Sequence, residues 1–507
     1  MGVFREGSDS ERRAAEWDRD ASVVNYATIL GGQVGSAALA FVSLWLAARI
    51  LGAEGYGGIV ALIAASQLIG HVTLQWTSIA VFRHGCEEFV NEARIASSFW
   101  NRLAILGGNL GLVLLAAPWW LPRVQHWLSI PTYGAGLILA HLVATALAVH
   151  VQQSLQAAKL PRFQSFAQLV ERGSVAAALI AATLFGPVGF RTIALLYVTS
   201  PLISSVVGTW RLRSLIFPRA SLDPTLIRTM LRFSYPLFFF SLVGYLTTSH
   251  VDAIFILRSL SPAELGVYAL AYQVAGVFMQ VPGLAGSLVM AFFITAGSSG
   301  GDKRIERFFK TTLPTVILAG SILAAVAAAA GSVLLGFFFD PSFDEARALL
   351  WPLLAAAALA APVMAAFGPA ANARSRTSIP AIAAAVGGAT NIGLNLLLIP
   401  RYGLVGCAWA TVAAFGVSLL VFAVLVPRVM TAPRSWTLSA TLPMVVGAAI
   451  AWKLGPAPAL VGAFACGAAV SMTHRRDISV CLRSLAALPQ LALISLWWKR
   501  AQSRGTM

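Results

Sequence analysis

One acidic residue, Asp252, lies well inside a long segment rich in Phe and Leu. An ionised carboxylate at bilayer depth costs on the order of 3 kcal/mol, so such a residue normally faces a partner or a wet cavity. Thr248, Tyr245 and Ser241 precede Asp252 at helical spacing and would share its face. The pattern predicts the polar wall of a cavity. A structural ion pair with Arg258, six residues further on, is the alternative.

Two arginines, Arg49 and Arg258, occupy equivalent places in two similar segments about two hundred residues apart. The segments read Arg49-Ile-Leu-Gly-Ala-Glu-Gly-Tyr-Gly and Arg258-Ser-Leu-Ser-Pro-Ala-Glu-Leu-Gly-Val-Tyr. Guanidinium groups bind phosphate oxygens in a bidentate manner, so the pair could hold a diphosphate. Pairing with Glu54 and Glu264 at helix ends, or contact with phospholipid phosphate, is the structural alternative.

Other polar side chains lie within or beside the apolar segments. Gln75, Gln273 and Gln280 could contact the hydroxyl groups of a polar ligand, or could join helices by hydrogen bonds. Arg83, beside the second segment, could meet a diphosphate on entry, or could serve only to fix topology. Four histidines could relay protons near neutral pH, although a neutral imidazole bound to a neighbouring helix explains each of them too: His71, His141, His150 and His250.

The elements that must position these residues are membrane helices. The composition, 58% hydrophobic and 11% charged over 507 residues, leaves too little charge to cover a soluble surface. Apolar windows of roughly 20 residues, long enough to cross ~30 Å of hydrocarbon, recur along the chain. Each is expected to be an α-helix, because a helix satisfies its own backbone groups in lipid. Fourteen spans are predicted, near residues 23–48, 56–81, 103–121, 133–155, 167–187, 192–210, 235–257, 266–290, 313–338, 350–371, 380–400, 405–426, 438–453 and 457–473.

Basic residues are distributed unevenly between the loops. With residues 1–22 in the cytoplasm, 28 Lys and Arg lie on the cytoplasmic side and seven lie on the other. This bias predicts that both termini are cytoplasmic and that the number of spans is even. The net charge of +16 is therefore interpreted as a topology signal, not as nucleic-acid binding. Residues 478–498, which Arg483 and Pro489 interrupt, are expected to lie at the inner interface, and a fifteenth span is the alternative.

Motifs that would indicate an enzyme, a pump or a metal site are missing from the sequence. There is no GxxxxGK[ST] or HExxH segment. The four cysteines form no CxxC pair and have no metal-ligand spacing, so they are expected to be small packing residues. The predicted external loops are too short to carry an active site. No enzymatic activity, cofactor or metal is therefore expected.

The similar arginine segments indicate an internal duplication. Six predicted spans separate them, an even number, so the two copies point the same way and are related by a pseudo-two-fold axis along the membrane normal. Duplicated helix bundles of this kind are typical of transporters. The predicted organisation is a cytoplasmic leader (1–22), an N-lobe (23–214), a cytoplasmic linker (215–232), a C-lobe (233–426), two further spans (427–473) and a cytoplasmic or interfacial tail (474–507).

Three segments also carry a family resemblance. Leu-Gly-Ala-Glu-x-Tyr-Gly after the first span, Ala-Glu-Leu-Gly-Val-Tyr after the seventh, and Tyr402-Gly-Leu-Val-Gly-Cys-Ala before the twelfth resemble the Wzx-type polysaccharide flippases. These form a branch of the multidrug/oligosaccharidyl-lipid/polysaccharide exporter superfamily. The resemblance covers roughly residues 20–470. It implies two six-helix lobes around a central cavity, with two extra C-terminal helices.

The resemblance also implies a function. Such relatives turn undecaprenyl-diphosphate-linked oligosaccharides from the inner to the outer leaflet of the bacterial inner membrane, and an acid such as Asp252 is common in their seventh span. The expected partners are the lipid-linked oligosaccharide, membrane lipids, and a polysaccharide polymerase with other assembly proteins. The residues expected along the translocation path are Asp252, Arg49, Arg258, Tyr245, Thr248, Gln75, Gln273, Gln280 and Arg83.

Three alternatives stay open at this point. A drug exporter would be expected to carry more carboxylates in the cavity of its first lobe. A lipid II flippase typically carries arginine in its first span, whereas no charge occurs here between Ser22 and Arg49. A membrane scaffold without transport activity, within a polysaccharide assembly complex, is the third.

Overall fold

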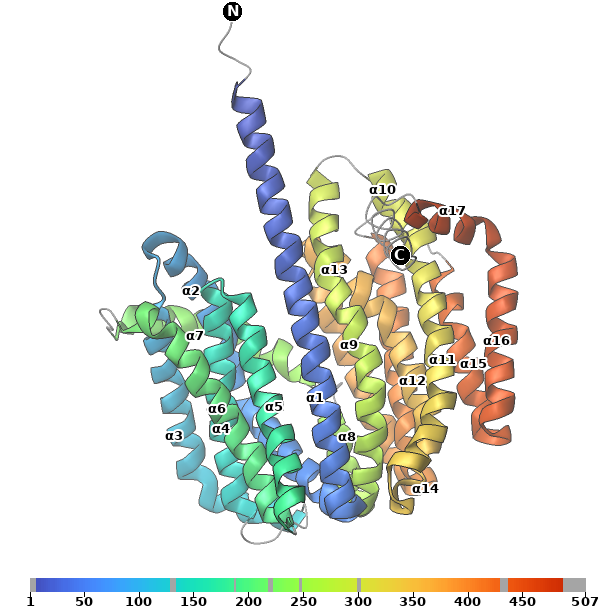
Figure 1. Cartoon of the computed structure of the whole chain (residues 1–507), viewed down its shortest axis with the longest axis horizontal. Coiled ribbons are helices and arrows are strands. Elements are labelled where there is room, and N and C mark those ends of the chain that lie inside the picture. Colours follow the sequence, from blue (N-terminus) through green and yellow to red (C-terminus); the bar gives the residue numbers. More distant parts are fainter. Residues whose placement is uncertain are drawn as a thin grey trace, which may run out of the picture. The chain divides into compact units, whose positions relative to one another are not determined.

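The computed structural model describes residues 6–127, 134–186, 188–217, 222–245, 249–298, 302–428 and 436–486. Within these ranges the chain forms helices and turns and no β-strand, which confirms the all-α prediction. Eleven helices are long and apolar enough to cross a membrane. The helices form two compact units, residues 1–269 and residues 270–507 (Figure 1).

Unit 1 is built from long helices that pack side by side. They are α1 (Glu6–Thr73), α2 (Ser78–Glu92), α3 (Ala96–Trp127), α4 (Gly134–Ala157), α5 (Pro161–Phe185), α6 (Phe190–Ile216), α7 (Pro224–Tyr245), α8 (Ser249–Ser259) and the first part of α9 (Pro262–Ser298). A short 3-10 turn, Gln75–Thr77, joins α1 to α2. Helix α5 packs against α1 and α6, and α4 packs against α2 and α6. Five helices of unit 1, α1, α2, α4, α5 and α6, are therefore linked by these packing contacts.

Unit 2 continues from the second part of α9. Its helices are α10 (Asp302–Arg307), α11 (Leu313–Phe338), α12 (Ala346–Pro362), α13 (Gly368–Ala373), α14 (Ser378–Leu425), α15 (Thr437–Leu454), α16 (Pro456–Thr473) and α17 (Arg475–Ala486). Helix α12 packs between α11, α14 and α15, and buries most of its length. Short π-helical segments at Phe308–Thr312 and Val363–Phe367 join α10 to α11 and α12 to α13.

Two of the long helices contain a sharp kink at a glycine. Gly52 in α1 has φ 66° and ψ −176°, and Gly403 in α14 has φ 57° and ψ −139°. Positive φ is strained for residues with a side chain, so glycine is needed at both positions. Each kink falls between two predicted spans, Gly52 in the first of the two repeated segments and Gly403 in the segment Tyr402-Gly-Leu-Val-Gly-Cys-Ala. The count of fourteen spans stays a prediction, because eleven helices meet the length and hydropathy limits as continuous elements.

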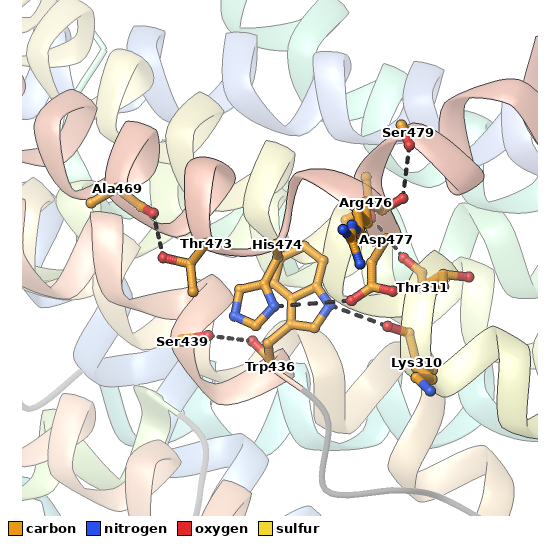
Figure 2. Close-up of polar contacts among 11 residues, drawn as sticks. Lys310, Thr311, Trp436, Ser439, Ala469, Thr473, His474, Arg476, Asp477 and Ser479 are labelled. Carbon is orange, nitrogen blue, oxygen red and sulfur yellow. Dashed lines mark hydrogen bonds and ion pairs between the residues drawn. The ribbon is translucent and has the colours of Figure 1, made fainter.

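The last described helix, α17, is amphipathic. An aromatic stack at the residue before it attaches it to the rest of unit 2. In Figure 1, α17 lies at the same end of unit 2 as α10. Figure 2 shows the His474 ring on the Trp436 indole, with ring centroids 4.6 Å apart and planes 7° apart. The Trp436 Nε1–H donates to the Lys310 carbonyl oxygen at 3.1 Å, and His474 Nδ1 lies 4.0 Å from an Asp477 carboxylate oxygen. The predicted interfacial segment thus starts as a docked helix, while residues 487–498 lie outside the described part of the chain.

Replacing Trp436 by Ala is expected to release α17. Cys481 on this helix is only 2% exposed, so the reaction of its thiol with a maleimide reports undocking. In a variant whose other three cysteines are replaced, we expect Trp436→Ala to react about fivefold faster, because an aromatic stack contributes on the order of 1 kcal/mol. Trp436→Phe keeps a stacking ring and should react at nearly the parent rate. Equal rates in Trp436→Ala and the parent would show that the stack does not hold the helix.

Candidate functional site

Asp252 lies in the interior of unit 1 and is bound to a tyrosine. The Tyr268 hydroxyl donates a hydrogen bond of 2.7 Å to an Asp252 carboxylate oxygen. Both side chains are only 1% exposed. The prediction that Asp252 is placed inside the bundle is thus consistent with its burial. Tyr268 belongs to the repeated segment of the sequence, but nothing in the sequence indicates that it contacts Asp252.

The backbone also favours a carboxylate at this position. Asp252 is in the first turn of α8, which begins at Ser249. The partial positive charge of a helix N-terminus stabilises a nearby carboxylate. Together, the helix end and the Tyr268 hydroxyl allow a buried carboxylate to persist where an isolated one would be costly.

The other polar residues expected on the same face are less fully described. Helix α7 ends at Tyr245 and α8 begins at Ser249, so the predicted seventh span contains two described helices. Thr248 and the side chain of Tyr245 lie outside the described residues. Their shared face with Asp252 stays a prediction.

Arg49 and Arg258 are both exposed, near the helix ends that precede the two repeated turns. The Arg49 guanidinium carbon lies 5.6 Å from the centre of the Trp45 ring. The expected alternative partner of Arg258, Glu264, instead caps α9. Its carboxylate accepts 2.8 Å hydrogen bonds from both the backbone N–H and the hydroxyl of Ser261. This reciprocal arrangement is a capping box, which fixes the start of α9.

The two repeated turns meet backbone to backbone within unit 1. A Cβ placed on Gly57 would lie 1.7 Å from the Pro262 carbonyl oxygen, and one placed on Gly266 would lie 2.1 Å from the Ala53 carbonyl oxygen. No side-chain carbon fits at either place. The structure therefore brings the two halves of the sequence repeat into direct contact, two residues before Tyr268.

Two further predicted residues of unit 1, Arg83 and Gln75, have neighbours of their own. Arg83 is exposed, 3.6 Å from Glu87 and with its guanidinium carbon 4.6 Å from the centre of the Phe233 ring. Gln75 donates from Nε2 to Gln67 Oε1 at 3.4 Å, a bond between the 3-10 turn that follows α1 and the last part of α1 itself. Gln273 and Gln280 are exposed on the part of α9 that belongs to unit 2.

Two further polar pairs lie in unit 1. Ser66 Oγ and His141 Nδ1, both in buried residues, are 2.5 Å apart. Gln152 Nε2 donates to Glu171 Oε2 at 3.3 Å. Helix α5 begins at Pro161, so Glu171 lies ten residues into the helix, about 15 Å along its axis.

Arg102 lies within α3 and is only 1% exposed. Its Nη2 donates to the Leu74 carbonyl oxygen at 3.2 Å, next to the end of α1. Its Nε and Nη1 have no hydrogen-bond partner among the described residues. Arg102 therefore links α3 to the residue that follows α1.

Metal binding is not indicated by the described residues. No group of three or more His, Cys, Asp or Glu side chains among them is arranged to hold an ion. The chemistry that the Asp252–Tyr268 pair can perform is to hold or release a proton, or to present a buried charge to a polar substrate.

Comparison with known proteins adds a family and a fold. The family model described as "Polysaccharide biosynthesis protein" matches residues 22–293. No curated protein matches the sequence. Among solved structures, the lipid II flippase MurJ in an inward closed conformation superimposes with a TM-score of 0.65 at 14% identity, covering 89% of this chain and 99% of that one.

Multidrug transporters share the same architecture. An inward-facing multidrug resistance MATE family transporter of the MOP superfamily has a TM-score of 0.53 at 15% identity, covering 78% of this chain and 94% of that one. The Vibrio cholerae MATE transporter VcmN has a TM-score of 0.52 at 12% identity, with 81% and 98% covered. At these identities the likeness establishes the fold alone.

Proposed function

Because the chain belongs to the polysaccharide biosynthesis protein family, we propose that it is a flippase for a lipid-linked oligosaccharide. Its cargo is an undecaprenyl-diphosphate-linked oligosaccharide, moved from the inner to the outer leaflet of the bacterial inner membrane for surface polysaccharide synthesis. The observation that carries the proposal is the buried Asp252–Tyr268 pair in a chain whose fold is shared with a lipid II flippase.

The proposed mechanism is alternating access. Asp252 and Tyr268 stand on either side of the turn between α8 and α9, and this turn packs on the turn at Gly52 through Gly57 and Gly266. If the two turns separate in one state and close in the other, the environment of the carboxylate changes with the state. A group whose interactions differ between two states biases the equilibrium between them.

Arg49 and Arg258 are proposed to receive the diphosphate where these turns lie. Both are exposed, so their guanidinium groups are free to reach phosphate oxygens from the helix ends. Cytoplasmic termini, and a polymerase and other assembly proteins as partners, belong to the same proposal.

A multidrug-type antiporter or a lipid II flippase is the second candidate. Two observations favour it: the fold is shared with MATE transporters, and its TM-score to the lipid II flippase is 0.65. These candidates differ from the first in cargo, so a cargo measurement separates them.

Deleting the gene in its host is expected to trap the cargo on the cytoplasmic side. Undecaprenyl-diphosphate oligosaccharide should accumulate, and its exposure at the outer leaflet should fall by more than about tenfold, because a diphosphate and sugars cross hydrocarbon extremely slowly without a carrier. The measurement is periplasmic labelling of the lipid-linked sugar in intact cells, with the gene restored on a plasmid as the control.

Two results would redirect the proposal. Normal outer-leaflet exposure in a strain without a redundant flippase would remove the oligosaccharide cargo. Accumulation of lipid II in the same extracts would favour the lipid II alternative, and increased sensitivity to cationic dyes alone would favour the antiporter.

A further inference from the structure

Unit 2 contains a cavity of about 680 Å³ that has no part in the site described above. Its lining comes from the end of α11, the start of α12, the part of α14 that follows Gly403, and the turn between α15 and α16. The charge bias of the sequence predicts that these helix ends face away from the cytoplasm. The volume is within the range of about 300–1,000 Å³ that is usual for small-ligand pockets.

One wall carries an ion pair, and the guanidinium of this pair lies against a glycine. Arg347 Nη2 lies 2.5 Å from an Asp344 carboxylate oxygen. A Cβ on Gly336 would lie 2.4 Å from Arg347 Nη2, so the absence of a side chain there makes room for the guanidinium. The pair is electrically neutral, yet it offers both hydrogen-bond donors and an acceptor. Arg347 Nε is buried with no hydrogen-bond partner among the described residues.

The other walls carry three indole rings at increasing exposure. Trp351 is 2% exposed, Trp409 is intermediate and Trp452 is 57% exposed. The Trp409 and Trp452 ring centroids are 5.7 Å apart, with planes at 41°. The Nε1 donors of Trp351 and Trp409 are buried and have no partner among the described residues. Because these two Nε1 atoms are buried, an occupant of the cavity would contact the indole rings and the Asp344–Arg347 pair that line it, not these two donors.

We propose that this cavity binds a neutral pyranose ring. The apolar C–H face of a pyranose packs on indole rings, and its hydroxyl groups both donate to a carboxylate and accept from guanidinium N–H groups. An anion fits less well, because Asp344 already neutralises Arg347. An acyl chain fits less well too, because it offers no hydrogen-bonding group to the Asp344 carboxylate and the Arg347 guanidinium that line the cavity.

The identity of the molecule that carries the pyranose ring rests on the proposed function. A sugar of the translocated oligosaccharide would enter this cavity after it reaches the outer side. Binding there would favour the outward-exposed product and hinder its return. The cavity itself requires only a neutral pyranose, whatever that ring is attached to.

The test is saturation-transfer NMR on the full-length protein in lipid nanodiscs. The probes are methyl glucoside, methyl galactoside, methyl mannoside and N-acetylglucosamine, with glycerol phosphate as the anionic probe. We expect ring protons of at least one pyranose to receive saturation. Trp409→Leu should reduce that transfer at least about fivefold, the loss expected when an aromatic face is removed.

Matched variants separate the cavity from general damage. Gly336→Val displaces the Arg347 guanidinium and should also abolish transfer. Gly320→Ala on the same helix has open space around its Cβ and should not. Trp119→Leu removes a 71% exposed indole from unit 1 and should leave transfer unchanged. A normal size-exclusion profile and unfolding midpoint for Trp409→Leu shows that it folds.

Three outcomes overturn the proposal. One is no saturation of any pyranose, another is equal saturation in Trp409→Leu, and the third is a response to glycerol phosphate alone. Export of lipid-linked oligosaccharide is measured in cells with the same variants. Export without pyranose binding rejects the site and keeps the proposed function, whereas Trp409-dependent binding without export of this cargo keeps the site and rejects the function.

Discussion

Replacing Asp252 by Asn is expected to lower export of the lipid-linked oligosaccharide by at least about tenfold, while the protein inserts into the membrane in normal amounts. Asn keeps the shape of the side chain and can still accept the hydrogen bond from the Tyr268 hydroxyl, which is 2.7 Å long in the native pair. What is lost is the charge. A hydrogen bond to a charged acceptor contributes about 1.5–3 kcal/mol, and one to a neutral acceptor about 0.5–1.5 kcal/mol. The interaction of the charge with the N-terminus of α8, about 1 kcal/mol, is lost as well, so a total of roughly 2 kcal/mol in one transport state shifts the equilibrium by about 30-fold.

The control for this prediction is a second substitution of a carboxylate by a carboxamide, placed at the repeated turns. Glu54 is exposed on the segment that follows Gly52, and Glu54→Gln should keep most of the export. Tyr268→Phe should have an intermediate effect, because it removes the donor but leaves the charge near the N-terminus of α8. Periplasmic labelling of the lipid-linked sugar measures all three. Wild-type export by Asp252→Asn would mean that the carboxylate is structural.

Much of the fold could be predicted because membrane helices leave a strong local signal. The apolar windows that ended near residues 48 and 400 correspond to the kinks at Gly52 and Gly403. Length and hydropathy depend only on consecutive residues, so a single sequence carries them. The start of α5 at Pro161 was missed because its first turns contain polar residues that the hydropathy window excluded.

The site was harder to predict because its contacts are not local. Asp252 was identified because an ionised carboxylate has a high free-energy cost in lipid, and this argument requires no knowledge of the neighbouring helices. Tyr268 lies on a different helix, and the chain must turn between α8 and α9 before the two side chains meet. Glu171 and Gln152 likewise come from α5 and α4. Helix periodicity gives the face of one helix, but it does not give the neighbour that covers that face.

The contact between the two repeated turns leads to the largest expected effect on stability. Gly266→Ala is expected to destabilise the protein by about 3 kcal/mol, at the upper end of the usual cost of overpacking. The new Cβ would lie 2.1 Å from the Ala53 carbonyl oxygen, and this oxygen belongs to the backbone and cannot rotate away. The measurement is the thermal unfolding midpoint in detergent, followed by fluorescence-detected size exclusion, where a fall of several degrees is expected.

A matched control lies on the same helix. Gly276 in α9 has no atom within 4 Å of its Cβ position, so Gly276→Ala should keep the midpoint or raise it slightly. Gly57→Ala should resemble Gly266→Ala, because its Cβ would lie 1.7 Å from the Pro262 carbonyl oxygen. A midpoint for Gly266→Ala equal to that of Gly276→Ala would show that the two turns do not touch in the folded protein.

The double variant tests whether the two glycines serve one contact. If Gly57→Ala already forces the turns apart, the Ala53 oxygen moves away from position 266, and the second substitution should add less than its separate cost. Full additivity would mean that each glycine accommodates a different neighbour. A sub-additive loss of stability, together with loss of export by the protein that still folds, would tie closure of the repeated turns to the movement that carries Asp252 and Tyr268 between states.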